Sequence, residues 1–395
     1  MSNTPKNELD SRMKRFTDKM DDAHDNWEIC AIVGGVNMFY LTGTMCDGVV
    51  LLRRGEGATL WVRRSFERAL IESEFSDIRS MRSFRDIAAT IDLLPDTLYV
   101  DTANATLEWL DLLKKYMPFK NVLALDSVIL NTRAVKSTYE LDIMRRAGSE
   151  TDRIFRDVLP NILYEGISEV ELGAELFAVF LKSGFHGVSR FSKRNIDSVL
   201  GHISFGESPI YPSAFNGASG IKGLCPAVPV LGNRDRFLRR GDLIYLDPGV
   251  GIGGYHIDKT LVLSYKQPQE ECVTAAHLHC LELERLAVSM LTPGTVPADI
   301  YEAVTASVND KYRDIFMGIK GRTVPFIGHG VGLNIDEMPV IAKGFTDPLK
   351  ENMTIAIEPK IGLDGIGMVG SENTYLVTKN GGISLTGEQR LLDLV

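Results

Sequence analysis

The stretch LDPGVGIGGYHIDKT, residues 246–260, decides between two folds. Gly249, Gly251 and Gly254 match the G-x-G-x-x-G pattern of dinucleotide-binding proteins, and they follow an apolar strand. That fold needs a helix directly after the glycines, so that the helix N-terminus faces a pyrophosphate. The chain continues instead with YHIDKTLVLSY, which favours β-structure. We therefore expect a β-hairpin, in which a strand at 244–247 pairs with a strand at 257–263.

The predicted hairpin would bring two carboxylates together. Asp247 and Asp258 lie eleven residues apart in the sequence. Side chains on neighbouring strands approach within about 5 Å. Two carboxylates at that distance repel each other unless a cation lies between them. The alternative is a pair of solvent-facing aspartates in a turn, and the two residues alone do not decide between these interpretations.

Three further residues extend this set toward the C-terminus. His329 lies in GHGVG (328–332), where the glycines let the backbone approach whatever the imidazole binds. Glu358 follows the apolar run MTIAI, and Glu372 begins the strand-like segment GSENTYLVT. Four carboxylates and one imidazole, without a thiolate, suit a structural zinc site poorly. They suit two divalent cations about 3.5–4 Å apart with a water between them, which is hydrolase chemistry.

The bulk properties exclude several classes of protein. The 395 residues favour two domains over one. A net charge of −9 argues against nucleic-acid binding. We expect no membrane span, because no run of 18 apolar residues occurs, and no signal peptide, because the polar N-terminus lacks an apolar core. The five cysteines form no CxxC pair, so we expect a reduced, cytoplasmic protein.

The periodicity of the chain predicts an α/β domain of about 130 residues, a linker at 130–136, and a second, larger domain. In the second domain, Ser137 with Glu140 and Ser168 with Glu171 have the spacing of capping boxes that open helices. A segment rich in Pro and Gly at 206–240 predicts a long irregular loop, and such loops are usually functional. Helices are expected at 268–291 and 297–312, followed by strands.

With these motifs in place, the chain from about Leu130 to the end resembles the pita-bread metallopeptidases. This family includes Xaa-Pro dipeptidases (prolidases), Xaa-Pro aminopeptidases and methionine aminopeptidases. The matching motifs are D-x-G, G-Y-x-x-D-x-T, G-H-G-x-G-L, E-P and S-E-N-T, which carry Asp247, Asp258, His329, Glu358 and Glu372. The N-terminal part, with NMFYLTG, resembles the accessory domain of prolidases and creatinases.

The resemblance implies an α/β (α+β) chain with a creatinase/prolidase-like N-terminal domain at 1–130 and a pita-bread catalytic domain at 131–395. It also implies two divalent metal ions (Mn, Co, Zn or Fe) held by the five residues named above, and a homodimer. The expected activity is cleavage of Xaa-Pro dipeptides or of N-terminal Xaa-Pro bonds in short peptides. In that reaction Glu358 would accept a proton from the attacking water and pass it to the leaving amine.

The sequence departs from the family pattern at three positions. Ser213 stands where prolidases carry a His in a Pro-His setting, and Asp336 stands where the second catalytic His is usual. Leu261 replaces the usual Arg after D-x-T. We expect Ser213 and Asp336 to contact the substrate. The histidines at 186, 202 and 256 could supply imidazole from elsewhere, although a structural or exposed role is the more ordinary expectation for each.

These departures keep two other functions open. One is a small-molecule amide hydrolase or lyase with the same fold and a non-peptide substrate. The other is a scaffold without enzyme activity, but scaffolds of this fold usually lose metal ligands, and none of the five is lost here.

Overall fold

The computed structural model describes residues 3–192, 197–213 and 215–395, and it divides the chain into two compact units, Met1–Arg133 and Ala134–Val395. The stretch expected to be a linker differs from the prediction. Its first part belongs to helix α6 (Asp126–Ala134), in which Thr132 Oγ1 donates to the carbonyl of Val128 and so adds to the helical hydrogen bonding.

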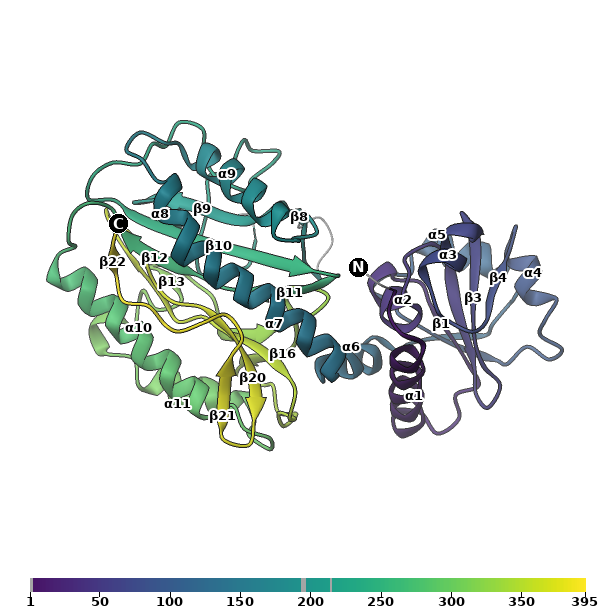
Figure 1. Ribbon diagram of the computed structural model, residues 1–395. Coiled ribbons are helices and arrows are strands. Elements are labelled where there is room, and N and C mark those ends of the chain that lie inside the picture. The colour runs from purple at the N-terminus through teal and green to yellow at the C-terminus, as the bar shows by residue number, and fades with distance from the viewer. Residues whose placement is uncertain (1–2, 193–196, 214) are drawn as a thin grey trace. The chain divides into compact units, whose positions relative to one another are not determined.

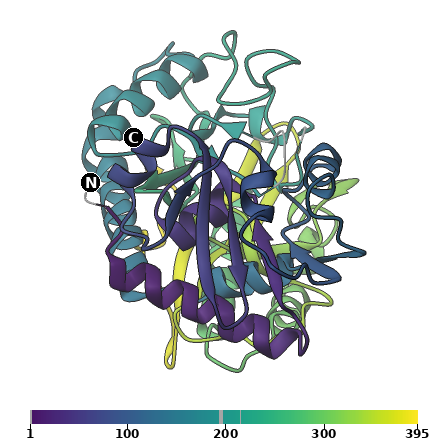
Figure 2. The ribbon, with the colours of Figure 1, turned by 90° about the vertical axis from the view of Figure 1, so that its right-hand side faces the viewer.

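The first unit is a mixed six-stranded sheet with helices around it (Figures 1 and 2). The strand order is β4-β3-β2-β1-β5-β6, where β1 pairs antiparallel with β2 and parallel with β5. The strands are β1 (Ile29–Ile32), β2 (Asp47–Arg53), β3 (Gly57–Arg64), β4 (Ile78–Ser80), β5 (Thr97–Val100) and β6 (Asn121–Ala124). The helices besides α6 are α1 (Lys6–Ala23), α2 (Gly35–Thr42), α3 (Phe66–Glu72), α4 (Phe84–Ala88) and α5 (Leu107–Lys114).

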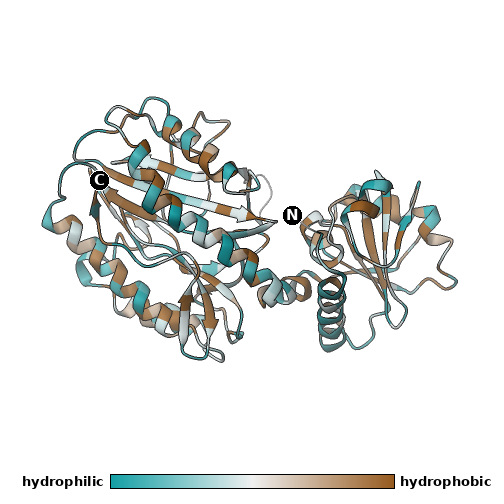
Figure 3. Cartoon of the chain, in the orientation of Figure 1, coloured by the Kyte–Doolittle hydropathy of each residue, from teal (hydrophilic) through white to brown (hydrophobic). Residues whose placement is uncertain are grey.

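Both faces of the first sheet are buried, as an α/β layer structure requires. Ile29 and Ala31 of β1 belong to one apolar cluster with residues of α4 and α5. The alternate residues Cys30 and Ile32 point to the opposite face and are also buried. In Figure 3 the strands of the first unit are largely brown, whereas helix α1 of the same unit is mostly teal.

The second unit is built around two curved sheets. In one, the path β11-β10-β12-β22 is extended by β9 pairing with β10, and in the other the order is β16-β15-β17-β20-β21. The first contains β9 (Gly201–Phe205), β10 (Leu243–Ile252), β11 (Tyr255–Asp258), β12 (Leu261–Ser264) and β22 (Asp393–Leu394). The second contains β15 (Phe326–Gly330), β16 (Glu337–Ala342), β17 (Thr354–Ile357), β20 (Asn373–Thr378) and β21 (Gly381–Ser384). Two-stranded ribbons are β7 (Ser189–Arg190) with β8 (Asp197–Ser198), β13 (Gly318–Ile319) with β14 (Arg322–Thr323), and β18 (Lys360–Leu363) with β19 (Gly367–Gly370).

Helices cover the outer surfaces of these sheets (Figure 1). Helix α7 packs on β10 and β11, α9 packs on β9, and α10 and α11 pack against strands of the C-terminal part. The helices are α7 (Thr138–Arg153), the π-helix η1 (Ile154–Val158), α8 (Leu159–Ile162), α9 (Glu169–Lys182), α10 (Glu271–Ser289) and α11 (Pro297–Ala306), with short 3₁₀ turns η2 (Ser208–Ile210) and η3 (Asp310–Tyr312). The capping boxes predicted at Ser137 and Ser168 are both present and open α7 and α9. The second predicted helix of the 268–312 region is shorter than expected, because only a 3₁₀ turn continues beyond α11.

The glycine-rich stretch forms strands, so the predicted hairpin is confirmed and the dinucleotide fold is excluded. Gly249 and Gly251 lie inside β10, and β11 returns antiparallel after a turn in which Gly253 and Gly254 have positive φ. The 206–240 region is largely without regular structure, as predicted, apart from η2. Among the residues that the structure describes, none of the helices has the length and apolar character that spanning a bilayer would require.

Candidate metal centre

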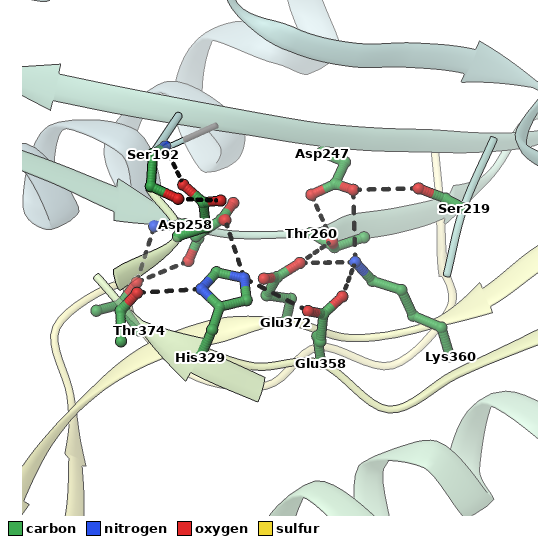
Figure 4. A network of polar contacts seen from close by, with 12 residues as sticks. Ser192, Ser219, Asp247, Asp258, Thr260, His329, Glu358, Lys360, Glu372 and Thr374 are labelled. Atoms are coloured by element: carbon green, nitrogen blue, oxygen red, sulfur yellow. Dashed lines mark hydrogen bonds and ion pairs between the residues drawn. The ribbon is translucent and has the colours of Figure 1, made fainter. Parts of the chain in front are cut away.

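The five candidate ligands converge on one place between the two sheets of the second unit (Figure 4). Asp247 lies within β10, and Asp258 ends β11. His329 lies in β15, Glu358 follows β17, and Glu372 immediately precedes β20. Hydrogen bonding between Thr260 N and the Glu372 carbonyl joins the two sheets beside the site. The structure therefore assembles side chains that span more than a hundred residues of sequence.

The register of the hairpin explains how both aspartates reach the site. Asp258 faces Gly249, while Asp247 lies two residues earlier on the same face of β10. The pairing is thus diagonal, whereas the sequence predicted side-by-side neighbours. A Cβ atom at Gly249 would lie 2.0 Å from Ile335 Cδ1, so a larger residue here would require the side chain of Ile335 to shift.

The imidazole of His329 is oriented by its own backbone neighbour. Nδ1 lies 3.1 Å from the Gly330 carbonyl, which fixes the proton on Nδ1 when the ring is neutral. Nε2 then faces the carboxylates, 3.5 Å from Glu358 Oε1 and 3.9 Å from Asp258 Oδ2. Metal-binding histidines typically show this arrangement, with one nitrogen held by a carbonyl and the other free to ligate.

Burial and crowding make the metal-free site electrostatically costly. Burial, and next the charge of Asp247, raise the pKa of Asp258 to about 7. Burial, and next Asp258, raise the pKa of Glu372 well above its usual range. Burial alone would lower the pKa of His329, but Glu358 and Asp258 raise it. Burial and mutual repulsion therefore disfavour the ionisation of all these carboxyl groups at once, and bound cations would offset that cost.

Asp247 is held on both of its oxygens. Oδ1 lies 2.9 Å from Thr260 Oγ1, and Oδ2 accepts hydrogen bonds from Tyr245 and Ser219 at 3.1 and 3.4 Å. Thr260 Oγ1 also lies 2.8 Å from Glu372 Oε2, although a hydroxyl has a single proton to donate. Burial raises the pKa of Asp247, but Lys360 and the hydrogen bonds outweigh burial and lower it overall.

A lysine that the sequence analysis did not single out also lies inside the site. Lys360 begins β18, two residues after Glu358, and only 2 % of its side chain is exposed. Its ammonium lies 2.7 Å from Glu372 Oε2, 3.0 Å from Glu358 Oε2 and 3.4 Å from Asp247 Oδ2 (Figure 4). Burial would lower the pKa of Lys360, but the three carboxylates raise it well above its usual value. A cation between glutamates in the segment EPKIGLDGIGMVGSE was a signal that could have been found.

Asp336 and Ser213, the two residues expected at the substrate, have different surroundings. Asp336 is partly buried and accepts hydrogen bonds from Ser192 N and Ser192 Oγ, at 2.5 and 2.8 Å. Its charge contributes to raising the pKa of His329. Ser213 Oγ accepts a hydrogen bond from Phe215 N, 3.1 Å away, so it is engaged within its own loop.

The three other histidines that the sequence singled out are His186, His202 and His256, and each is at least partly buried. His186 Nε2 and His256 Nε2 lie 3.2 Å apart, and burial lowers the pKa values of the two rings to about 4 and about 3. Both rings contact groups of the fold around them, so a structural role stays the prediction for this pair. His202 differs, because it pairs with Asp247 across β9 and β10, and its Nδ1 lies 3.3 Å from Ser219 Oγ. Burial lowers the pKa of His202 to about 4, so a neutral imidazole borders the site.

This geometry agrees with comparisons to known proteins. Residues 142–379 match the model of metallopeptidase family M24, and residues 12–135 match the creatinase/prolidase N-terminal domain. The chain belongs to metallopeptidase family M24. A family M24 chain is a metallopeptidase with two divalent metal ions, and the pita-bread fold expected from the sequence is confirmed.

Several relatives match nearly the whole length of the chain. An Xaa-Pro dipeptidase from Pyrococcus furiosus is 26 % identical over 388 residues, covering 97 % of this chain and 100 % of that protein. A dipeptidase PepE structure from Mycobacterium ulcerans superposes with a TM-score of 0.81 at 23 % identity, covering 100 % of both chains. The prolidase structure from Pyrococcus horikoshii has a TM-score of 0.78 at 24 % identity, covering 97 % of this chain and 99 % of that one.

The donor set fits the metal ions of this family. Ligand atoms of Asp258, His329 and Glu372 all lie within 4.8 Å of one another. Oxygen donors with one imidazole suit Mn, Fe, Co or Zn, and the chemistry of the donors alone does not select among them.

Proposed function

We propose that this protein hydrolyses Xaa-Pro dipeptides, or the N-terminal Xaa-Pro bond of short peptides, at a dinuclear metal centre. The observation that carries the proposal is the convergence of Asp258, His329 and Glu372, with Asp247 and Glu358 beside them. The relatives described above are named as dipeptidases and a prolidase, which favours a peptide substrate over the small-molecule alternative.

The proposed ligands divide by position. Asp258 and Glu372 would help to hold both ions, because Asp258 lies 3.9 Å from His329 and Glu372 shares Thr260 Oγ1 with Asp247. When bound, two divalent ions polarise the scissile carbonyl and lower the pKa of an attacking water toward neutrality. Glu358 then serves as the proton acceptor and delivers that proton to the leaving amine, because its Oε1 faces the centre beside His329 Nε2.

Asp336 is proposed to contact the substrate. A partly exposed carboxylate that Ser192 holds by two hydrogen bonds is preorganised to receive a cationic group such as the α-ammonium of a dipeptide. Ser213 is proposed to act through the loop at 206–240, where its hydroxyl is engaged with Phe215 N in the absence of substrate. His202 adds a neutral imidazole beside Asp247 that can donate or accept a hydrogen bond.

The test is hydrolysis of a panel of Xaa-Pro dipeptides and Xaa-Pro-Yaa peptides by protein stripped of metal and reloaded with Mn, Co, Zn or Fe(II). We expect metal-dependent cleavage with kcat/KM on the order of 10⁴ M⁻¹s⁻¹ or better. His329→Ala should abolish cleavage while the protein stays folded. His279→Ala is the matched control, because His279 lies on α10 and contacts Asn309 N and Glu282 instead of the site. Full activity in the His329 variant, or no cleavage with any metal, would contradict the proposal.

Three broader features complete the proposal. We place the domain boundary near residue 130, with the metal centre wholly in the C-terminal domain. The cysteines of the described residues are free thiols, which supports a reducing, cytoplasmic setting. We also propose a homodimer, and light scattering of the purified protein would test it, because a monomeric mass at micromolar concentration would exclude a stable dimer.

A further inference from the structure

The cation of Lys360 divides the ligand set into two parts. On one side, Asp258, His329 and Glu372 offer donor atoms within 4.8 Å of one another. On the other side, the ammonium of Lys360 contacts Asp247, Glu358 and Glu372. Glu372 is common to both sides, and Glu358 adjoins both, because its Oε1 lies 3.5 Å from His329 Nε2 while its Oε2 contacts Lys360. The five candidate ligands therefore enclose two cation positions, and one of them holds a side chain of the protein itself (Figure 4).

The ammonium of Lys360 is enclosed by carboxylate oxygens. Its three protons match the three carboxylate oxygens at 2.7, 3.0 and 3.4 Å, so its hydrogen-bonding capacity is saturated. Only 2 % of the Lys360 side chain is exposed, so water does not compete for these contacts. Metal–carboxylate distances are about 2.0–2.2 Å, so a metal ion needs the same oxygens even closer together. An ammonium and a divalent ion cannot share this position.

We infer that the second metal ion can bind only by displacing the ammonium of Lys360 from Asp247, Glu358 and Glu372. The first ion enters the position that includes His329, where the ammonium of Lys360 contacts Glu372 and leaves Asp258 and His329 to the ion. Lys360 thus acts as a built-in competitor that sets the affinity of the second position and, through it, the metal concentration at which the enzyme is fully loaded. The inference rests on the proposed metal centre, but it does not depend on the substrate.

The experiment compares Mn²⁺ binding to metal-stripped wild type and to Lys360→Met, which keeps the length of the side chain and removes its charge. Isothermal titration gives the affinities. Electron paramagnetic resonance distinguishes an isolated Mn²⁺ from a coupled pair about 3.5–4 Å apart. In wild type we expect two binding phases whose Kd values differ by about 100-fold or more. In Lys360→Met the second phase should tighten by at least about tenfold and the first should change by less than about threefold.

Lys259→Met is the matched control. Lys259 is equally buried, but its ammonium donates to the amide oxygen of Asn373 and the carbonyl of Thr386. This substitution removes a buried cation of the same unit and should leave both Mn²⁺ phases in place. Circular dichroism establishes that each variant is folded before titration.

The outcomes separate this inference from the metal centre itself. A first phase that disappears in His329→Ala establishes the centre. With that phase present, an unchanged or weaker second phase in Lys360→Met overturns the competition. Equal affinities for the two ions in wild type overturn it as well. The absence of any Mn²⁺ phase in wild type would overturn the metal centre and the inference together.

Discussion

Asp258→Asn is expected to stabilise the metal-free protein above neutral pH while it removes metal binding. Burial and the neighbouring Asp247 raise the pKa of Asp258 from 3.8 to about 7. Between these values the folded chain binds more protons than the unfolded chain, so the free energy of unfolding decreases as the pH rises from about 4 to about 7. Three pH units at 1.36 kcal/mol each correspond to about 4 kcal/mol as an upper limit. Because an amide has no charge to lose, we expect Asp258→Asn to recover about 2 kcal/mol or more of this at about pH 8.

The assay is urea denaturation of EDTA-treated protein at about pH 5 and about pH 8. Far-UV circular dichroism follows the whole chain. Tryptophan fluorescence follows only the first unit, since the three tryptophans are Trp27, Trp61 and Trp109, and it serves as an internal control that should not change. The buried pair His186 and His256 also titrates on unfolding, but in the opposite direction and equally in both proteins.

The difference between variant and wild type therefore reports the charge of Asp258 together with its effect on the pKa values of Glu372 and His329. The gain should be present at about pH 8 and largely absent at about pH 5. With Mn²⁺ at about a hundred times its Kd, wild type should gain about 2.7 kcal/mol and Asp258→Asn much less. A variant that is no more stable than wild type at about pH 8, or that shows the same gain at both pH values, would refute the reasoning.

Three other substitutions test the support of the site. Gly249→Ala should lower the free energy of unfolding by about 1–3 kcal/mol, because its Cβ would lie 2.0 Å from Ile335 Cδ1. Thermal scans should show that adding Ile335→Ala recovers part of this loss. Glu284→Leu removes the acceptor of hydrogen bonds from Asn373, Tyr375 and Gln389, and it should destabilise the second unit by about 1–3 kcal/mol with the tryptophan signal unaffected. No measurable loss of stability would contradict this. Ser192→Ala removes one of the two hydrogen bonds that Ser192 donates to Asp336. It should raise KM for dipeptides severalfold with little change in kcat. An equal fall in kcat would place Asp336 in the chemical step instead.

Much of the fold and the site was predictable because local sequence dictates it. A strand, a glycine turn and a second strand admit only a hairpin, and the Ser-x-x-Glu spacing at 137 and 168 specifies two helix starts directly. The exact register was not predictable, since the diagonal placement of Asp247 and Asp258 follows from how β11 and β12 share one partner strand.

The positions of Lys360 and His202 depend on tertiary contacts, which the sequence alone does not show. The sequence places Lys360 between two glutamates, but it does not show that the side chain turns inward, because carboxylates from β10 and from the segment before β20 hold it there. No motif surrounds His202, so its sequence predicts a structural or exposed residue. Pairing of β9 with β10 nevertheless places it opposite Asp247. The sequence predicts a linker at 130–136 although α6 extends to Ala134, because a short helix of modest amphipathicity gives a weak periodic signal.

Lys360 also has a consequence for the order of events during synthesis. The candidate ligands come from strands far apart in the sequence, so they come together only when the whole second unit has formed. At that moment their carboxylates would repel one another. An ammonium delivered by the same chain neutralises part of that repulsion without any diffusing partner. The polypeptide can thus mature into its final shape in a metal-poor environment and acquire its full complement of ions afterwards, as a separate step.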